Sequence, residues 1–443
     1  MYWSALDLYR VGPGPSSSRT VGPQRAALRF VHALAADGVI GRTARVDVHL
    51  FGALAFTGRE SGTDAAVVSG LSGEAPERSD AKSMRARLRH VDTEGLPLGG
   101  AHRIAFAPGR NVRFHMGRAV AYDGNALRFD AFDPGGASLA SRVYFTDAGG
   151  DVLDEAEAAG NRASVRVAYP FASAEALLET CRSYGKRVAD IARANECALR
   201  SPEEVRRGLT HVAQAMRASV ERGLATRGHL PGSLVERRAP DQAQALATVD
   251  ATPREHCAVY ATAVAEDNAA GGCVVAAPTH GSAGPVAALL AFWRANESMP
   301  SDERAQDFLL AGAAVAQAIQ GAGLRQAGCQ SAVGLGAAMA AAGYAAALGG
   351  SPPQIVFAAE RALEAHWGLA CDSAAGLVQH PCIARNAAGA ARAIDAAHAA
   401  VRQPAPRIGL DKLVHSMVET ARGMAGRYKA DSLAGVASNV ADC

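Results

Sequence analysis

The sequence predicts an α+β protein, in which an N-terminal α/β domain is followed by an all-helical domain. Two observations support this fold class. Short alternating segments separated by Gly, Pro or Asp fill the first part of the chain, a pattern typical of strands. From about residue 172 onward, Ala-rich segments with helical spacing alternate with Gly/Pro loops. We therefore expect an N-terminal domain over residues 1–165 and an all-helical domain over residues 166–443.

The N-terminal elements follow from the spacing of their apolar residues. QRAALRFVHAL at 24–34 has helical spacing, whereas ARVDVHLFGALAF at 44–56 alternates like a strand. Further short strands are expected at RIAFAP, NVRFHM, ALRFDAFD and SRVYFTDAG, over residues 103–108, 111–116, 126–133 and 141–149.

Three segments characterise the second half. The stretch from 173 to 199 is helical, and the polar residues 226–241, with Gly and Pro, predict a loop between helices. Residues 331–350 contain no charge over twenty positions, the length of a membrane span. They are mostly Ala and Gly and lack flanking Trp or Tyr anchors, so we expect a buried, closely packed helix instead.

Composition excludes some partners. The 443 residues carry a net charge of +2 with both signs interspersed, which gives no reason to expect a nucleic acid or membrane partner. The N-terminus has no basic segment followed by an apolar one, so we expect a cytoplasmic protein. Eight cysteines in such a chain are expected to be reduced.

Four cysteines of the helical half attract attention: Cys329, Cys371, Cys382 and the terminal Cys443. Taken singly, each reads as a small core residue. However, Cys371 lies in a Gly-rich segment without periodicity and Cys382 follows a proline, positions where backbone N–H groups stabilise thiolates. Three thiolates without a nearby fourth suit a [4Fe–4S] cluster with one open iron that acts as a Lewis acid. Spacing alone does not decide between the two interpretations.

Six segments together carry a resemblance to a known family. They are GPGPSSSRTVGPQRAALRF, FGALAFTGRESGTDAAV, EDNAAGGCVVAAPTHGSAG, AGCQSAVG, GLACDSAAGLVQHPCIARNA and SLAGVASNVADC. In this order, and over essentially the whole chain, they resemble the bacterial iron–sulfur-dependent L-serine dehydratases. The resemblance implies a homodimeric lyase that acts on a small amino acid. It further implies a [4Fe–4S] cluster on Cys329, Cys371 and Cys382, with Cys443 on the open iron.

Two segments rich in hydroxyls and small residues are candidate cradles for a substrate carboxylate, GPSSSRT at 14–20 and APTHGSAG at 277–284. Helix capping is the alternative for Ser18, Thr20 and Ser282. With the resemblance, the expected substrate-binding residues are Ser16, Ser17, Ser18, Thr20, Ser61, Thr279, Gly281 and Ser282.

The chain departs from the family pattern where cluster and substrate are expected. Arg19 and Ser61 replace histidines, His280 replaces an asparagine, and Ser331 and Ala332 replace Gly and Glu. The segment CDSAAG at 371–376 also differs. Arg19 suits a carboxylate and cannot be a base, whereas His280 is equally a candidate base and a structural residue.

Several functions stay open as a result. The first is cluster-assisted elimination at Cβ of L-serine, or of a related amino acid with a further anionic group. Another is loss of a thiol from a cysteine-like substrate, because a thiolate would bind an open iron well. A third is a non-catalytic iron–sulfur sensor, favoured by the missing histidines and disfavoured by the retained cradle residues.

The remaining notable residues have more ordinary interpretations. Thr63 and Asp64 read as a helix start. Arg385 and Asn386 are candidates to hydrogen-bond cluster sulfur or the tail carboxylate. Packing roles are expected for His366, Trp367, Cys181, Cys197, Cys257 and Cys273.

Overall fold

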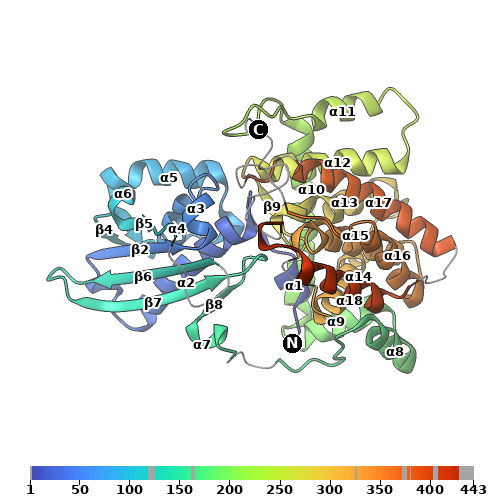
Figure 1. Ribbon diagram of the computed structural model, residues 1–443, viewed down its shortest axis with the longest axis horizontal. Coiled ribbons are helices and arrows are strands. Elements are labelled where there is room, and N and C mark those ends of the chain that lie inside the picture. The colour runs from blue at the N-terminus through green and yellow to red at the C-terminus, as the bar shows by residue number, and fades with distance from the viewer. Residues whose placement is uncertain are drawn as a thin grey trace. The chain divides into compact units, whose positions relative to one another are not determined.

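The computed structural model describes residues 2–117, 125–160, 165–324, 327–371, 377–379, 381–402 and 408–428. The chain divides into two compact units (Figure 1). The N-terminal unit contains Gly12–Ala163 and Ala270–Cys273, and the helical unit contains Met1–Val11, Ser164–Ala269 and Val274–Cys443. The start of the chain thus groups with the helical unit. The α+β fold class is confirmed.

A five-stranded sheet with the order β5-β2-β6-β7-β8 forms one layer of the N-terminal unit. β5 runs parallel to β2, and the other neighbours are antiparallel. The strands are β2 (Arg45–Phe51), β5 (Val112–Phe114), β6 (Asn125–Phe132), β7 (Ser138–Thr146) and β8 (Val152–Asp154). Three strands expected from alternation, at 111–116, 126–133 and 141–149, are confirmed. Two small sheets pair β3 (Leu96–Leu98) with β4 (His102–Ile104), and β1 (Val11–Pro13) with β9 (Cys273–Val275).

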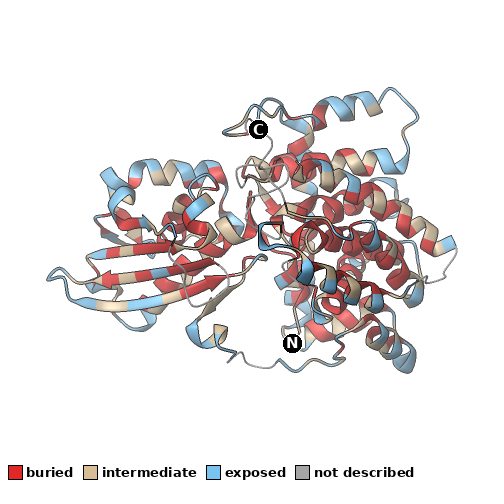
Figure 2. Cartoon of the chain, viewed as in Figure 1, coloured by how far each residue is buried: buried red, intermediate tan, exposed pale blue. Residues whose placement is uncertain are grey.

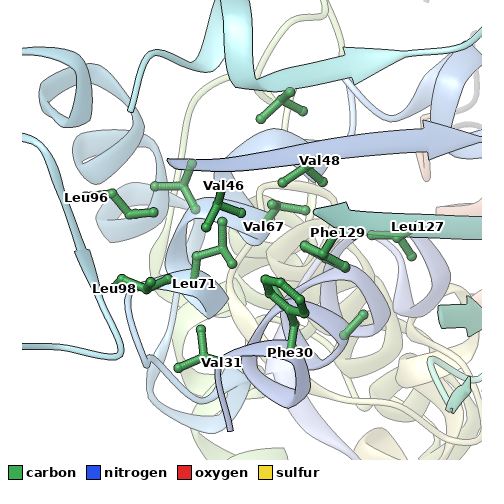
Figure 3. Close-up of a cluster of buried hydrophobic side chains, with 14 of the residues drawn as sticks. Phe30, Val31, Val46, Val48, Val67, Leu71, Leu96, Leu98, Leu127 and Phe129 are labelled. Carbon is green, nitrogen blue, oxygen red and sulfur yellow. The ribbon is translucent and has the colours of Figure 1, made fainter. Parts of the chain in front are cut away.

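One face of this sheet packs against helices α2 (Gly22–Ala36) and α4 (Thr63–Leu71), as Figure 3 shows. Alternate residues of β2 reach this core, and the rings of Phe30 and Phe129 stack with their centroids 5.1 Å apart. Full burial of one such side chain contributes about 1.5–3 kcal/mol. The other helices of the unit are α3 (Ala53–Thr57), α5 (Ala81–Glu94), α6 (Pro108–Asn111) and α7 (Glu155–Ala158), with short helices η1 (Ser17–Val21), η2 (Ile40–Arg42) and η3 (Pro76–Arg78).

The strand expected over 44–56 was wrong in its second half. β2 ends at Phe51, and residues 53–57 form helix α3. Gly52 adopts a positive φ of 64°, which turns the chain out of the sheet.

The helical unit surrounds one buried helix. It consists of α1 (Ala5–Leu8), α8 (Ala174–Tyr184), α9 (Val188–Cys197), α10 (Pro202–Ala225), α11 (Ala239–Leu246), α12 (Pro253–Ala269), α13 (Ala283–Asn296), α14 (Asp302–Gly321), α15 (Val333–Ala347), α16 (Pro352–Glu364), α17 (Cys382–Arg402) and α18 (Leu410–Gly423), with short helices η4 (His280–Ser282), η5 (Gly328–Gln330) and η7 (Gly426–Tyr428). Helix α15 contacts α13, α14, α16 and α17 and is buried almost throughout (Figure 2). The buried helix expected within 331–350 is confirmed. Within the described ranges, no helix combines the length and apolarity needed to cross a bilayer.

Candidate functional site

The three predicted cluster ligands lie at irregular or helix-start positions of the helical unit. Cys329 is buried in η5, Cys371 follows α16 outside any helix, and Cys382 is the first residue of α17. Cys371 and Cys382 are half-buried. Cys443 lies outside the described residues, which end at Tyr428.

Hydrogen bonds tie the segments of Cys329 and Cys371 together through Gln330, a fully buried residue. The Gln330 N–H donates to the Leu369 carbonyl at 3.3 Å, and its Oε1 accepts the Gly368 N–H at 3.0 Å. The Cys371 N–H donates to the Tyr428 carbonyl at 2.6 Å. Two predicted ligands that are 42 positions apart in sequence thus belong to segments held side by side.

The third predicted ligand joins them through the first turn of α17. Arg385 Nη1 lies 3.3 Å from Cys329 Sγ and donates to the Ala370 carbonyl at 2.9 Å. A guanidinium beside sulfur stabilises the thiolate form that binds iron. Among the residues that the structure describes, no three His, Cys, Asp or Glu side chains converge on one metal ion. A cluster spreads its ligands over several irons, so the three thiols need not converge on one point.

Ser331, which stands where the family pattern has Gly, closes the turn around Cys329. Its Oγ accepts the Ala327 N–H at 2.7 Å and donates to the Gly328 carbonyl at 3.1 Å. The hydroxyl is therefore used within the loop. Sequence reasoning identified the replacement but missed this role.

The segment of His280 forms a tight turn before α13. Thr279 and Ser282 cap it: the Thr279 N–H reaches Ser282 Oγ at 3.3 Å, and this hydroxyl donates to the Ala277 carbonyl at 3.0 Å. His280 is 1% exposed. The Gly281 carbonyl accepts from Asn386 Nδ2 at 2.8 Å. Ser282 stands at the N-cap of α13, but its side chain makes no capping bond to that helix, because the hydroxyl is used within the turn of η4.

In the N-terminal unit, the segments around Arg19 and Ser61 lie side by side. The Thr63 Oγ1 donates to the Arg19 carbonyl at 2.6 Å, and Thr63 begins α4 as expected. Burial raises the pKa of the neighbouring Asp64 carboxyl. The hydrogen bond that this carboxyl accepts from the Ala65 N–H lowers the pKa but does not offset the effect of burial. Ser61 is 3% exposed, and its Oγ finds no hydrogen-bond partner among the described residues.

The hydroxyl-bearing residues of the first candidate cradle differ in their contacts. Thr20 Oγ1 donates to the carbonyls of Pro13, at 2.9 Å, and Ser16, so this hydroxyl shapes the loop. The hydroxyls of Ser16 and Ser18 lie 3.3 Å apart, and Ser17 starts η1 as a buried residue.

Two of the four cysteines expected to have packing roles, Cys181 and Cys257, are buried. Burial raises the pKa of Cys181 to about 11, and it raises the pKa of Cys257 further. Both side chains are in the core. His366 is also buried, which lowers its pKa, and its Nδ1 lies 2.8 Å from the Ala362 carbonyl.

Comparisons with known proteins cover nearly the whole chain. The family described as serine dehydratase beta chain matches residues 4–157, and the family described as serine dehydratase alpha chain matches residues 183–437. L-serine dehydratase 1 of Escherichia coli is 40% identical over 451 residues, with 99% of each chain covered. L-serine dehydratases of Streptomyces coelicolor, 38% identical, and Haemophilus influenzae, 36% identical, also align over 99% of each chain. The chain therefore belongs to the L-serine dehydratase family, with the alpha and beta parts joined in one chain.

Proposed function

We propose that this chain is an iron–sulfur-dependent lyase that eliminates the β-substituent of a small amino acid, with L-serine as the first substrate to test. The observation that carries the proposal is the similarity to L-serine dehydratases over 99% of the chain. The contacts that link the segments of the three predicted ligands support it.

Cys329, Cys371 and Cys382 are the proposed ligands of a [4Fe–4S] cluster. Their thiols are the donors that such clusters use, and the Arg385 guanidinium adds a positive charge beside one of them. When bound, the cluster would supply a Lewis-acidic iron that takes up charge from a leaving β-hydroxyl.

The protein's own residues would supply the proton chemistry. Elimination breaks the Cα–H bond and the Cβ–O bond, and the electron pair of the first becomes the new C=C bond. In the helical unit, His280 is the proposed base for the α-proton. In the N-terminal unit, Arg19 is the proposed partner of the substrate carboxylate. The enamine product tautomerises to an imine, which water hydrolyses to a 2-oxo acid and ammonia.

Cys443 is proposed to occupy the open iron in the resting enzyme. Tyr428, the last described residue, already bonds the backbone of Cys371. Cys443 follows Tyr428 by fifteen positions, and an extended chain of this length spans at most about 50 Å. Deletion of Cys443 should leave the cluster in place and change its spectrum. An unchanged spectrum would contradict the proposal.

A second substrate class is favoured by Ser61. Its hydroxyl is buried without a hydrogen-bond partner in the described part of the chain, and such a group is costly unless something satisfies it. Arg19 belongs to the neighbouring segment. A substrate with one more polar group than serine would provide a partner for the Ser61 hydroxyl, and a guanidinium such as that of Arg19 suits an anionic group.

The test is anaerobic. The reconstituted chain is offered L-serine, L-threonine, L-cysteine and 3-hydroxy-L-aspartate, which keeps the β-hydroxyl and adds a carboxylate, and 2-oxo acid and ammonia are assayed. Pyruvate from serine supports the first proposal, and turnover of the anionic substrate alone supports the second. An intact cluster with no product from any of them would favour a sensor. Sedimentation of the same sample tests the proposed homodimer.

Ligand assignment needs variants. Cys329→Ser, Cys371→Ser and Cys382→Ser should each prevent stable cluster assembly. Cys197→Ser is the matched control, because Cys197 is also half-buried and ends a helix of the same unit. A full iron complement in all three ligand variants would overturn the assignment.

A further inference from the structure

Asn386 connects two segments that the proposed mechanism uses separately. It lies one turn into α17, four residues after Cys382, and is 2% exposed. Its Nδ2 donates to the Gly281 carbonyl at 2.8 Å and to the Cys382 carbonyl at 2.9 Å. Its Oδ1 accepts the Gly284 N–H at 3.0 Å. One side chain therefore holds both ends of the turn that follows His280.

These contacts require an amide in one orientation. Two carbonyl oxygens face Nδ2 and one N–H faces Oδ1, so a flipped amide would oppose like groups at all three contacts. A carboxylate of the same shape would keep the bond from Gly284 but place an oxygen against the carbonyls of Gly281 and Cys382. Buried without its donors, that oxygen would repel both segments.

The close approach of α13 to α17 depends on the same residue. A Cβ at Gly284 would lie 2.7 Å from Asn386 Oδ1 and 2.9 Å from the Ala261 carbonyl. Only glycine lets the start of α13 come this near. The turn is therefore held from both sides, by the amide of Asn386 and by the absence of a side chain at Gly284.

We propose that Asn386 is a positioning residue that fixes the His280 turn against the first turn of the cluster helix α17. Its neighbour Arg385 reaches Cys329 and the Ala370 carbonyl. Two consecutive residues of α17 thus hold the turn of the proposed base and the segments of the proposed ligands in fixed positions relative to each other. The catalytic part of this inference rests on the proposed function, whereas the structural part does not.

The test compares Asn386→Asp with Asn195→Asp in the full-length chain. Asn195 is also fully buried in the same unit, and its side-chain amide hydrogen-bonds the N–H and carbonyl of Tyr169 at 2.7 and 2.8 Å. Asn195→Asp therefore removes a comparable buried amide contact at a place away from the proposed site. Hydrogen exchange is measured with and without iron. Asn386→Asp should lose protection over residues 279–286 and at the start of α17, whereas Asn195→Asp should not. Unchanged protection over 279–286 overturns the proposal, as does a loss spread evenly over the helical unit.

Kinetics test the catalytic part on the reconstituted chain. A misplaced base lowers kcat by up to about 100-fold while KM stays unchanged. In a His280→Gln background, Asn386→Asp should lower kcat no further, because both changes remove the same interaction. Additive losses overturn the role in positioning His280. If no substrate turns over, the proposed function fails and hydrogen exchange still decides the structural part. If Asn386→Asp does not fold, Gly284→Ala replaces it in both experiments, because the added methyl group disturbs the contact between Gly284 and Asn386 without introducing a charge.

Discussion

Gly328 allows the two cysteine segments to approach each other, and its replacement by alanine measures how much that approach matters. The residue has a φ of +68°, where alanine costs about 1–2 kcal/mol. An added Cβ would lie 2.8 Å from the Leu369 carbonyl oxygen and 3.1 Å from the Cys371 nitrogen. Because both are backbone atoms that cannot rotate away, overpacking adds about 1–3 kcal/mol. We expect Gly328→Ala to lose about 2–5 kcal/mol of local stability.

Two assays read this loss. Urea unfolding of the full chain should show a lower midpoint, and anaerobic reconstitution should give less iron per chain because Cys329 and Cys371 move apart. The control is Gly423→Ala at the end of α18, where a Cβ meets nothing within 4 Å and φ is not positive. A Gly328→Ala protein with full iron and an unchanged midpoint would refute the argument.

Three further outcomes are expected. Ser331→Ala should leave the buried Ala327 N–H without its acceptor and cost about 1–3 kcal/mol, measured as a lower thermal midpoint; an unchanged midpoint would contradict this role. Glu196→Gln removes the charge that accepts three hydrogen bonds from residues 2–5, so limited proteolysis should cut the N-terminus sooner; equal cleavage rates would speak against it. Burial pushes the pKa of Glu157 upward, but hydrogen bonds from Arg29 and a backbone N–H outweigh it, so the pKa lies below its ordinary 4.5. The contribution of the Glu157 carboxylate to the free energy of unfolding is thus present above pH 4.5 and lost as pH falls through the lowered pKa. The stability gap between wild type and Glu157→Gln should therefore close in acid, and a gap independent of pH would argue for packing instead.

Sequence patterning predicted the elements whose environment is periodic. Only one face of the five-stranded sheet meets α2 and α4, so β2 alternates visibly, and the buried helix α15 is small and uncharged throughout. The same alternation could not show where β2 stops, because the apolar residues of α3 continue it. Nor could any local pattern assign residues 2–11 to the helical unit. That placement depends on contacts such as Ser4 Oγ to Glu196 Oε2, across 192 positions.

The candidate site was predictable in its residue types and less so in its connections. The Gly-rich segment of Cys371 and the proline before Cys382 predicted loop or helix-start positions, and the structure confirms both. Arg385 contacts a predicted ligand sulfur, as the sequence suggested, whereas Asn386 bonds backbone groups of a turn about 100 positions away. Such pairings come from tertiary packing and leave no spacing signal. The roles of the substrate residues and of Cys443 stay predictions.

The N-terminal unit is an insertion. The chain begins in the helical unit, leaves it after Val11 and returns at Ser164. If the polypeptide were cut between 160 and 165, the shorter fragment would keep residues 2–11, and their hydrogen-bond partners Glu196 and Gln317 would belong to the longer fragment. Association of two such fragments would then require residues 2–11, with helix α1, to pack onto the longer fragment, and neither fragment would be complete on its own. If two genes encoded the two fragments, each product would need the other, because residues 2–11 of the first belong to the helical unit that the second forms.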